Sequence, residues 1–145
     1  MSANLEAIAI LNELLALEQG QLALRLAESG TFISKAGVDK ARILRDLESK
    51  AHQHGARISK TVLRLEGSPG MRVGDINTAH VHFQQIRIAW PLLVEDMRKL
   101  VAAYRSGAEK LVATPAAART VGEILAEHEA SLQTLEAALA EMANA

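Results

Sequence analysis

The longest uninterrupted helical pattern in the chain lies between Thr114 and Met142 and reads TPAAARTVGEILAEHEASLQTLEAALAEM. Thr114 followed by Pro115 is typical of a helix start, because Thr caps free backbone amides and Pro fits the first helical turn. Apolar residues then recur in steps of three and four, which places them on one face. The members of that face are Val121, Leu125, His128, Leu132, Leu135, Leu139 and Met142, with Ser131 on its border. We therefore predict one long helix that presents a histidine to a protein core.

Three clusters of Gly and Pro divide the chain into stretches of similar length. They lie at residues 30–37, 67–74 and 107–115. Gly ends helices because it accepts positive φ, and Pro cannot continue a helix. We expect Asn4 or Ser2 to cap the first helix, Gly30 to end it and Gly67 to end the second. The three further helices are predicted over residues 4–29, 38–66 and 79–104.

The third of these helices has a mixed pattern. Apolar residues alternate between residues 79 and 90, as in a strand, but a longer stripe with helical spacing continues to Tyr104. The members of that stripe are Ala79, Phe83, Ile86, Trp90, Val94, Met97, Val101 and Tyr104. The longer pattern favours a helix. Pro91 either kinks this helix or marks its true first turn, and the sequence leaves both open.

Length and composition limit the classes of protein to consider. A chain of 145 residues suits a single domain over residues 1–145. A net charge of −1 gives no basic field for nucleic acid or anionic lipid. The absence of Cys excludes disulfides and thiolate metal sites. The N-terminal apolar run is interrupted by charged residues and has no basic leader. We expect a cytoplasmic protein that binds neither nucleic acid nor membrane.

Four long helices predict an all-α four-helix bundle. Helices of this length extend roughly 40 Å and can pack side by side, antiparallel, along their full length. The connection between the second and third helices has two solutions. A simple up-down-up-down order needs only a short connection between the two helices. A long crossover would require residues 67–77 to cross the whole bundle at about 3.3 Å per residue, which they can only just do.

Three of the predicted helices carry an ionisable residue on the apolar face, near the middle of the helix. These residues are Glu18, His54 and His128, and they could meet in one layer of the bundle. A carboxylate and two imidazoles can bind a divalent cation such as iron or zinc. Alternatively, Glu18 pairs with a histidine and fixes the register of the bundle without a metal. A buried Glu needs a partner in either case.

The pattern resembles the metal-site motifs of the ferritin-like superfamily, and of bacterioferritin in particular. The di-iron site of that family takes one Glu from each of two helices and a Glu-x-x-His pair from each of the other two. Glu18 looks like the first-helix Glu, and His54, followed by Leu65-Glu66-Gly67-Ser68-Pro69, looks like the second-helix His. Glu123-Ile124-Leu125 and Leu135-Glu136 resemble the last helix. The resemblance implies a ferritin-like bundle with inward-pointing metal ligands, assembled as a homo-oligomer.

The family motif is incomplete in this chain. Ala51 stands where the second helix of the family has a bridging Glu. In the last helix the Glu and His positions look like His128 and Ser131, although a shift of one residue would make Glu127 the ligand instead.

On the third helix Glu95 is a further candidate carboxylate, although its neighbour Val94 occupies the core stripe. Glu95 shares a face with Arg98 and Lys99, so the alternative is a solvated side chain. The predicted metal ligands are Glu18, His54, His128, Glu127 and Glu95.

Three other histidines were weighed as ligands. His52 lies at or beside the position that looks like the axial haem Met of bacterioferritin, but surface histidines are far commoner than haem ligands, and we expect no haem. His80 and His82 are two residues apart, so on a helix they point to different faces and do not share a metal.

The sequence leaves three functions open. The first is a ferritin-like protein with an incomplete di-iron site that binds iron or another divalent metal inside the bundle. The second is a metal-free ferritin-like structural or interaction module. The third is a mononuclear non-haem iron redox protein, because two His and one carboxylate are the ligands of such sites. Whether the chain is an enzyme stays open at this point.

Overall fold

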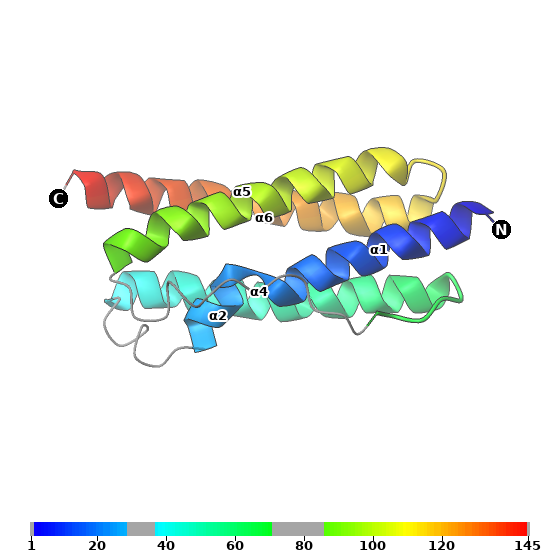
Figure 1. Ribbon diagram of the computed structural model, residues 1–145, viewed down its shortest axis with the longest axis horizontal. Helices are drawn as coiled ribbons and strands as arrows, with labels where there is room; N and C mark the ends of the chain where they lie inside the picture. Colours follow the sequence, from blue (N-terminus) through cyan, green and yellow to red (C-terminus); the bar gives the residue numbers. More distant parts are fainter. Residues whose placement is uncertain (1, 29–36, 71–85, 145) are drawn as a thin grey trace.

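Four long helical segments lie side by side and form a bundle (Figure 1). The computed structural model describes residues 2–28, 37–70 and 86–144, and these residues contain no strand. The predicted all-α class is therefore confirmed. In chain order the helices are α1 (Ser2–Gly20), α2 (Leu22–Glu28), α4 (Val38–Arg64), α5 (Ile86–Lys110) and α6 (Pro115–Ala143).

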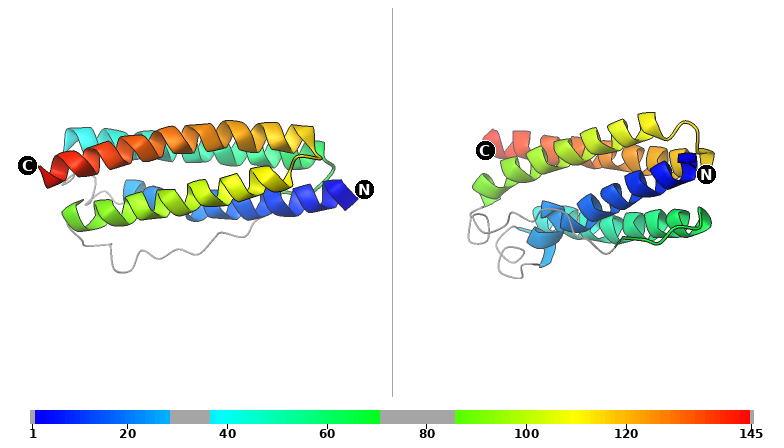
Figure 2. Two further views of the ribbon diagram at one scale, coloured as in Figure 1. Left: turned by 90° about the horizontal axis from the view of Figure 1, so that it is seen from above. Right: turned by 45° about the vertical axis from the view of Figure 1, so that its right-hand side comes forward.

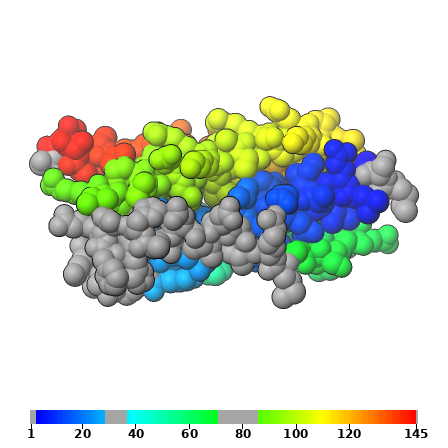
Figure 3. Space-filling view, viewed as in Figure 1, coloured from blue at the N-terminus to red at the C-terminus, as the bar shows by residue number. Residues whose placement is uncertain are grey.

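The helices form a closed ring in the order α1, α4, α6, α5, in which each packs against the two beside it. Figure 2 shows the same arrangement from two further directions. The short helix α2 follows α1 and packs on α4. Side chains of α1 and α5 meet along the face drawn in Figure 3. The core is thus enclosed on four sides.

Neighbouring helices in the ring are antiparallel, as predicted, whereas α4 and α5 run in the same direction (Figure 1). Because α4 ends and α5 begins at opposite ends of the bundle, their connection crosses its whole length. The long crossover is correct, and the simple up-down-up-down order is wrong. Asn12 on α1 holds the start of this connection, since its side chain donates to Ser68 O (3.1 Å) and accepts from Gly70 N (2.7 Å).

The core is apolar, with large side chains from every long helix. Trp90 is fully buried, and its indole N–H donates to Leu135 O at 3.0 Å. The core face of α6 differs from the prediction: Ile124, Ser131 and Ala138 are buried, whereas Leu125, Leu132 and Leu139 are only half-buried. Because α6 packs between α4 and α5, these three positions of its buried face lie one residue earlier than predicted, whereas Val121, His128 and Leu135 are buried as predicted.

The first predicted helix is broken in the structure, because α1 ends at Gly20 and α2 begins at Leu22. The backbone N–H of Leu22 donates to Asp96 Oδ2 of α5 at 3.0 Å instead of to the preceding turn. Arg25 satisfies a carbonyl freed by the break, since its side chain donates to Gln19 O at 3.1 Å. The prediction of one continuous helix was wrong because a partner on another helix takes over a hydrogen bond of the helical ladder.

The predicted helix ends are partly confirmed. Asn4 lies inside α1 and is not its cap, and Gly30 lies outside the described residues. α5 begins at Ile86, residues 79–85 lie outside the described part, and Pro91 lies inside the helix beyond its first turn. α6 begins at Pro115 as predicted, but the Thr114 hydroxyl makes no capping hydrogen bond.

The end of α4 uses Glu66 where the sequence predicted Gly67. Glu66 takes the left-handed conformation (φ 67°), and Gly67 N donates to Val62 O at 2.9 Å. Gly67 serves a different purpose. A Cβ atom at this position would lie 2.7–2.9 Å from three side-chain atoms of Ile8, so the glycine permits a close approach of α1.

Among the described helices, none is long and apolar enough to cross a membrane.

Two glycines give a matched test of this packing. Gly67→Ala should lower the free energy of unfolding by about 1–3 kcal/mol, because the added methyl overpacks against Ile8. Gly122→Ala, in the middle of α6 with nothing within 4 Å of the added Cβ, should raise it by about 0.5–1 kcal/mol. Urea denaturation of the three proteins measures both effects. Equal changes in the two variants would contradict this account of Gly67.

Candidate metal centre

One carboxylate, that of Glu18, lies at the centre of the bundle and has no exposed surface. Glu18 lies on α1, and each of the three other long helices directs one side chain at its carboxylate. These side chains are His54 from α4, Tyr104 from α5 and His128 from α6. The apolar periodicity of each helix places these residues inward, and all four are at least 97% buried. The predicted meeting of Glu18, His54 and His128 in one layer is what the structure has.

Both oxygens of Glu18 have hydrogen-bond donors. Oε1 accepts from the Tyr104 hydroxyl at 2.7 Å and from His128 Nε2. Oε2 accepts from the side-chain amide of Gln21 at 2.6 Å, and the same amide contacts Glu18 O at 2.9 Å. The His128 ring lies edge-on to those of His54 and Tyr104, with centroids 4.7 and 5.0 Å away. The carboxylate is thus fixed in one orientation.

His54 has a different partner on each ring nitrogen. Nε2 lies 3.0 Å from Glu127 Oε1, and since an ionised carboxylate only accepts, Nε2 carries the hydrogen. Glu127 Oε2 in turn accepts from Arg57 at 3.2 Å. Nδ1 points into the bundle, 3.5 Å from Glu18 Oε1, and is fully buried without a hydrogen bond. His54 is therefore anchored by a hydrogen bond on its outer side, whereas its inner nitrogen has only the longer contact with Glu18.

These contacts shift the ionisation of the cluster. Burial would raise the pKa of Glu18, but the hydrogen bond from His128 and the close approach of His54 outweigh burial and lower the pKa from 4.5 to about 2. Burial likewise lowers the pKa of His54, and the carboxylates of Glu18 and Glu127 reverse that effect and raise it. Burial and the charge of Glu18 both raise the pKa of Tyr104, which stays protonated as a donor. Glu18 is an anion at neutral pH.

The spacing of the three donors matches the size of a single ion. One ligand atom from each of Glu18, His54 and His128 lies within 4.8 Å of the other two. Two ligands bound to one zinc ion at about 2.0–2.2 Å are at most about 4.4 Å apart, so small side-chain movements suffice. Two neutral imidazoles and a carboxylate are a common ligand set for first-row divalent metals.

The other two predicted ligands lie elsewhere. Glu127 is 40% exposed and contacts the outer nitrogen of His54. Glu95 is 61% exposed and lies 3.8 Å from Lys99, so the structure does not bring it to the cluster. Its neighbour Val94 occupies the core position, and a step of one residue turns a helical side chain by about 100°. His52 is exposed on α4, and His80 and His82 lie outside the described residues.

Sequence reasoning missed two members of the cluster. Tyr104 was placed on the core stripe of the third helix but was given no partner. A buried Tyr hydroxyl almost always has one, and this rule would have pointed to Glu18. Gln21 was missed although it lies three residues after Glu18, a spacing that brings side chains together on a helix.

The fold can now be compared with known proteins. No protein-family model matches the sequence, and no curated protein matches it. Among solved structures, bacterioferritin from Desulfovibrio desulfuricans is similar, with a TM-score of 0.83 and 16% sequence identity over 99% of this chain and 83% of that chain. The fold is ferritin-like. That bacterioferritin has a diiron site, described in different catalytic states. For this chain the ferritin-like fold confirms the family resemblance at the level of architecture.

The low pKa of Glu18 predicts how stability depends on pH. Because the folded pKa lies below the unfolded value of 4.5, the stabilisation is complete above that value and is lost as pH falls toward 2. His54 is protonated in both states over this range and adds no slope. With chelator present, the free energy of unfolding should fall by about 2 kcal/mol more in wild type than in Glu18→Gln from about pH 5 to about pH 3. The free energy of unfolding of both proteins is measured by urea denaturation at each pH. If the two curves of this free energy against pH are parallel, Glu18 is not ionised and paired in the folded protein.

Proposed function

We propose that this ferritin-like bundle binds one divalent transition-metal ion, iron(II) or zinc(II), through Glu18, His54 and His128. The observation that carries the proposal is His54 Nδ1, a buried nitrogen without a hydrogen bond that points at a buried carboxylate. Unpaired buried polar atoms are rare and call for an explanation. A metal ion between Nδ1, Glu18 and His128 would provide one.

The hydrogen bond of His54 to Glu127 supports this assignment. Histidines that bind a metal through one nitrogen usually donate the other N–H to a carboxylate or a carbonyl, which fixes the tautomer. Here Nε2 donates to Glu127 at 3.0 Å, and a neutral His54 then has its lone pair on Nδ1, inside the bundle. His128 donates through Nε2 to Glu18, so this proton must leave when metal binds.

The residues do not fit two ions. A di-iron centre of this fold draws on four carboxylates and two histidines from the four helices. In this chain the buried positions Ala51 and Val94 carry no ligand atom, and Glu127 faces the outer side of His54. The described residues that could hold metal together are one carboxylate and two imidazoles. We therefore assign no two-metal ferroxidase chemistry to this chain.

A bound iron(II) ion would supply one-electron redox chemistry at a coordination position that the protein leaves open. The residues around the cluster determine its surroundings. Tyr104 and Gln21 hold the two oxygens of Glu18 and limit its rotation. The apolar layers above and below exclude water and strengthen each electrostatic contact. Tyr104 retains its proton and acts as a hydrogen-bond donor.

The chain offers a matched pair of histidines to test the proposal. His54 is buried at the cluster, and His52 is exposed on the same helix. Chelator-stripped wild type should bind one zinc(II) or, without oxygen, one iron(II) per chain in calorimetric titration. His54→Gln should weaken binding by more than about 100-fold, since the loss of even an outer-shell partner costs about 10–100-fold. His52→Gln should bind like wild type. No binding by wild type, two ions per chain, or equal loss in both variants would reject the proposal.

A second matched pair tests the outer partner of His54. Glu127→Ala should lower metal affinity by about 10–100-fold while binding stays at one ion per chain, because the His54 tautomer is no longer fixed. Glu129→Ala removes a carboxylate of similar exposure on the same helix, which pairs with Arg105 at 3.0 Å, and should change affinity less than twofold. Titration with zinc(II) compares the two. If Glu127→Ala binds as tightly as Glu129→Ala, the orienting role of Glu127 is wrong.

The metal-free module has one observation in its favour, since Tyr104, Gln21 and His128 already satisfy Glu18 without an ion. Replacing Glu18 with Leu and His54 with Phe separates the two functions. For a metal-free module, wild type binds no ion and the double variant folds at least as stably, because apolar residues often replace buried ion pairs without loss. Specific binding of one ion by wild type excludes it.

A further inference from the structure

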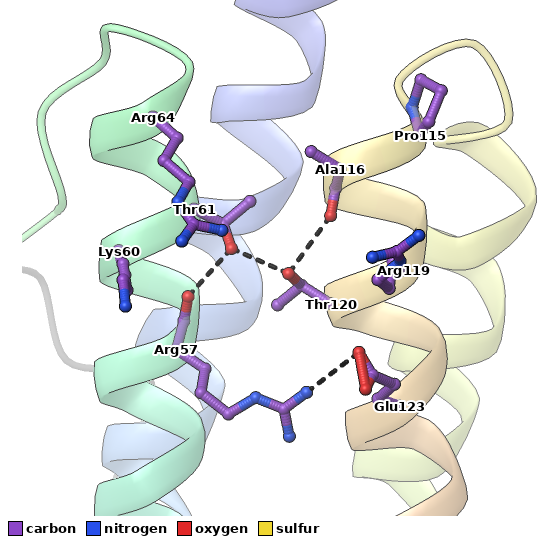
Figure 4. Close-up of a pocket in the computed structure, with 9 residues that line it drawn as sticks. All are labelled: Arg57, Lys60, Thr61, Arg64, Pro115, Ala116, Arg119, Thr120 and Glu123. Carbon is purple, nitrogen blue, oxygen red and sulfur yellow. Dashed lines mark hydrogen bonds and ion pairs between the residues drawn. The ribbon is translucent and has the colours of Figure 1, made fainter.

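A second polar site lies on the surface of the bundle and is connected to the outer side of the metal cluster through Arg57, which pairs with Glu127. A pocket of about 480 Å³ opens between α4 and the first turns of α6 (Figure 4). This volume is within the range of small-molecule sites, about 300–1,000 Å³. Nine residues line the pocket: Arg57, Lys60, Thr61, Arg64, Pro115, Ala116, Arg119, Thr120 and Glu123.

The lining of the pocket carries an excess of positive charge. It holds four cationic side chains and one carboxylate. Arg57 is neutralised, because it lies 3.3 Å from Glu123 and 3.2 Å from Glu127. Lys60 and Arg64 on α4 and Arg119 on α6 make no ion pair or hydrogen bond with any described residue. Since the whole chain has a net charge of −1, this excess is a local feature of the pocket.

The floor of the pocket is polar and rigid. Thr61, only 4% exposed, and Thr120 join α4 to α6 through a hydrogen bond of 2.8 Å between their hydroxyls (Figure 4). Each hydroxyl also contacts the carbonyl four residues earlier, Arg57 O at 3.0 Å or Ala116 O at 3.2 Å. The cationic side chains thus lie on two helices that the hydrogen bond between Thr61 and Thr120 holds together.

We propose that this pocket binds a small, soluble phosphate-bearing anion. Guanidinium groups match the geometry of phosphate oxygens, and three unpaired cations on two helices suit a ligand with two or more negative charges. The pocket includes Pro115 and Ala116 at the start of α6, where the helix dipole adds a weak field of the same sign. Glu123, the one carboxylate in the lining, would repel a polyanion extended along α6, which favours a compact ligand.

The test uses pyrophosphate as the probe, with inorganic phosphate as the weaker analogue. Calorimetric titration in about 0.1 M chloride, where long-range attraction is screened, should detect pyrophosphate binding to the full chain. The double variant Arg64→Gln/Arg119→Gln should bind at least tenfold more weakly, because each loses a charge-assisted hydrogen bond. Arg57 is left intact, since it also holds Glu127 beside His54. Zinc(II) binding by the double variant should be unchanged, which separates this site from the metal cluster.

The matched control is Arg98→Gln/Arg105→Gln, which removes the same charge from two surface arginines of α5 that pair with Glu136 and Glu129. It should bind pyrophosphate within twofold of wild type. Absence of binding by wild type, or equal weakening in both double variants, would overturn the proposal. So would tighter binding of a short single-stranded oligonucleotide or of anionic phospholipid vesicles than of pyrophosphate, if the same two arginines were required.

Discussion

Glu18 Oε1 accepts hydrogen bonds from Tyr104 on α5 and His128 on α6, and it lies 3.5 Å from His54 on α4. A charged carboxylate in an apolar bundle costs several kcal/mol unless its partners are in place. Because these two donors and His54 come from the three other sides of the ring, the rotation and axial position of each helix are tied to one oxygen atom. The apolar residues drive association of the helices, and this contact determines their register.

The break between α1 and α2 belongs to the same constraint. Gln21 leaves the helical path, which allows its amide to reach both the backbone and the side chain of Glu18. Asp96 on α5 accepts the N–H of Leu22 that the break exposes, and burial raises the pKa of its carboxyl above the usual value. In a continuous helix Glu18 O would accept the N–H of Leu22, whereas here it accepts the Gln21 amide that also binds Glu18 Oε2. The interruption therefore contributes to the site as well as to the path of the chain.

Much of the fold could be predicted from sequence, because helical periodicity and Gly and Pro clusters are local signals. The same periodicity predicted that Glu18, His54 and His128 share one layer. It did not predict the break after Gly20, where Gln21 turns to Glu18, nor the role of Asp96, which depends on a contact between helices. It also did not predict the purpose of Gly67, which is space for Ile8. Glu95 was a candidate as a carboxylate near the middle of the third helix, but Val94 beside it takes the core position. Assembly into an oligomer and location in the cytoplasm remain predictions.

We propose that this bundle holds a site for one ion between two imidazoles and one carboxylate, whereas the similar bacterioferritin has a diiron site. The most direct measurement is anomalous diffraction from crystals of the metal-loaded protein, recorded at the absorption edge of the added metal. The account predicts a single peak bonded to Glu18, His54 Nδ1 and His128 Nε2, with Glu127 still on His54 Nε2. Two neighbouring peaks inside the bundle, or no peak within reach of Glu18, would contradict it.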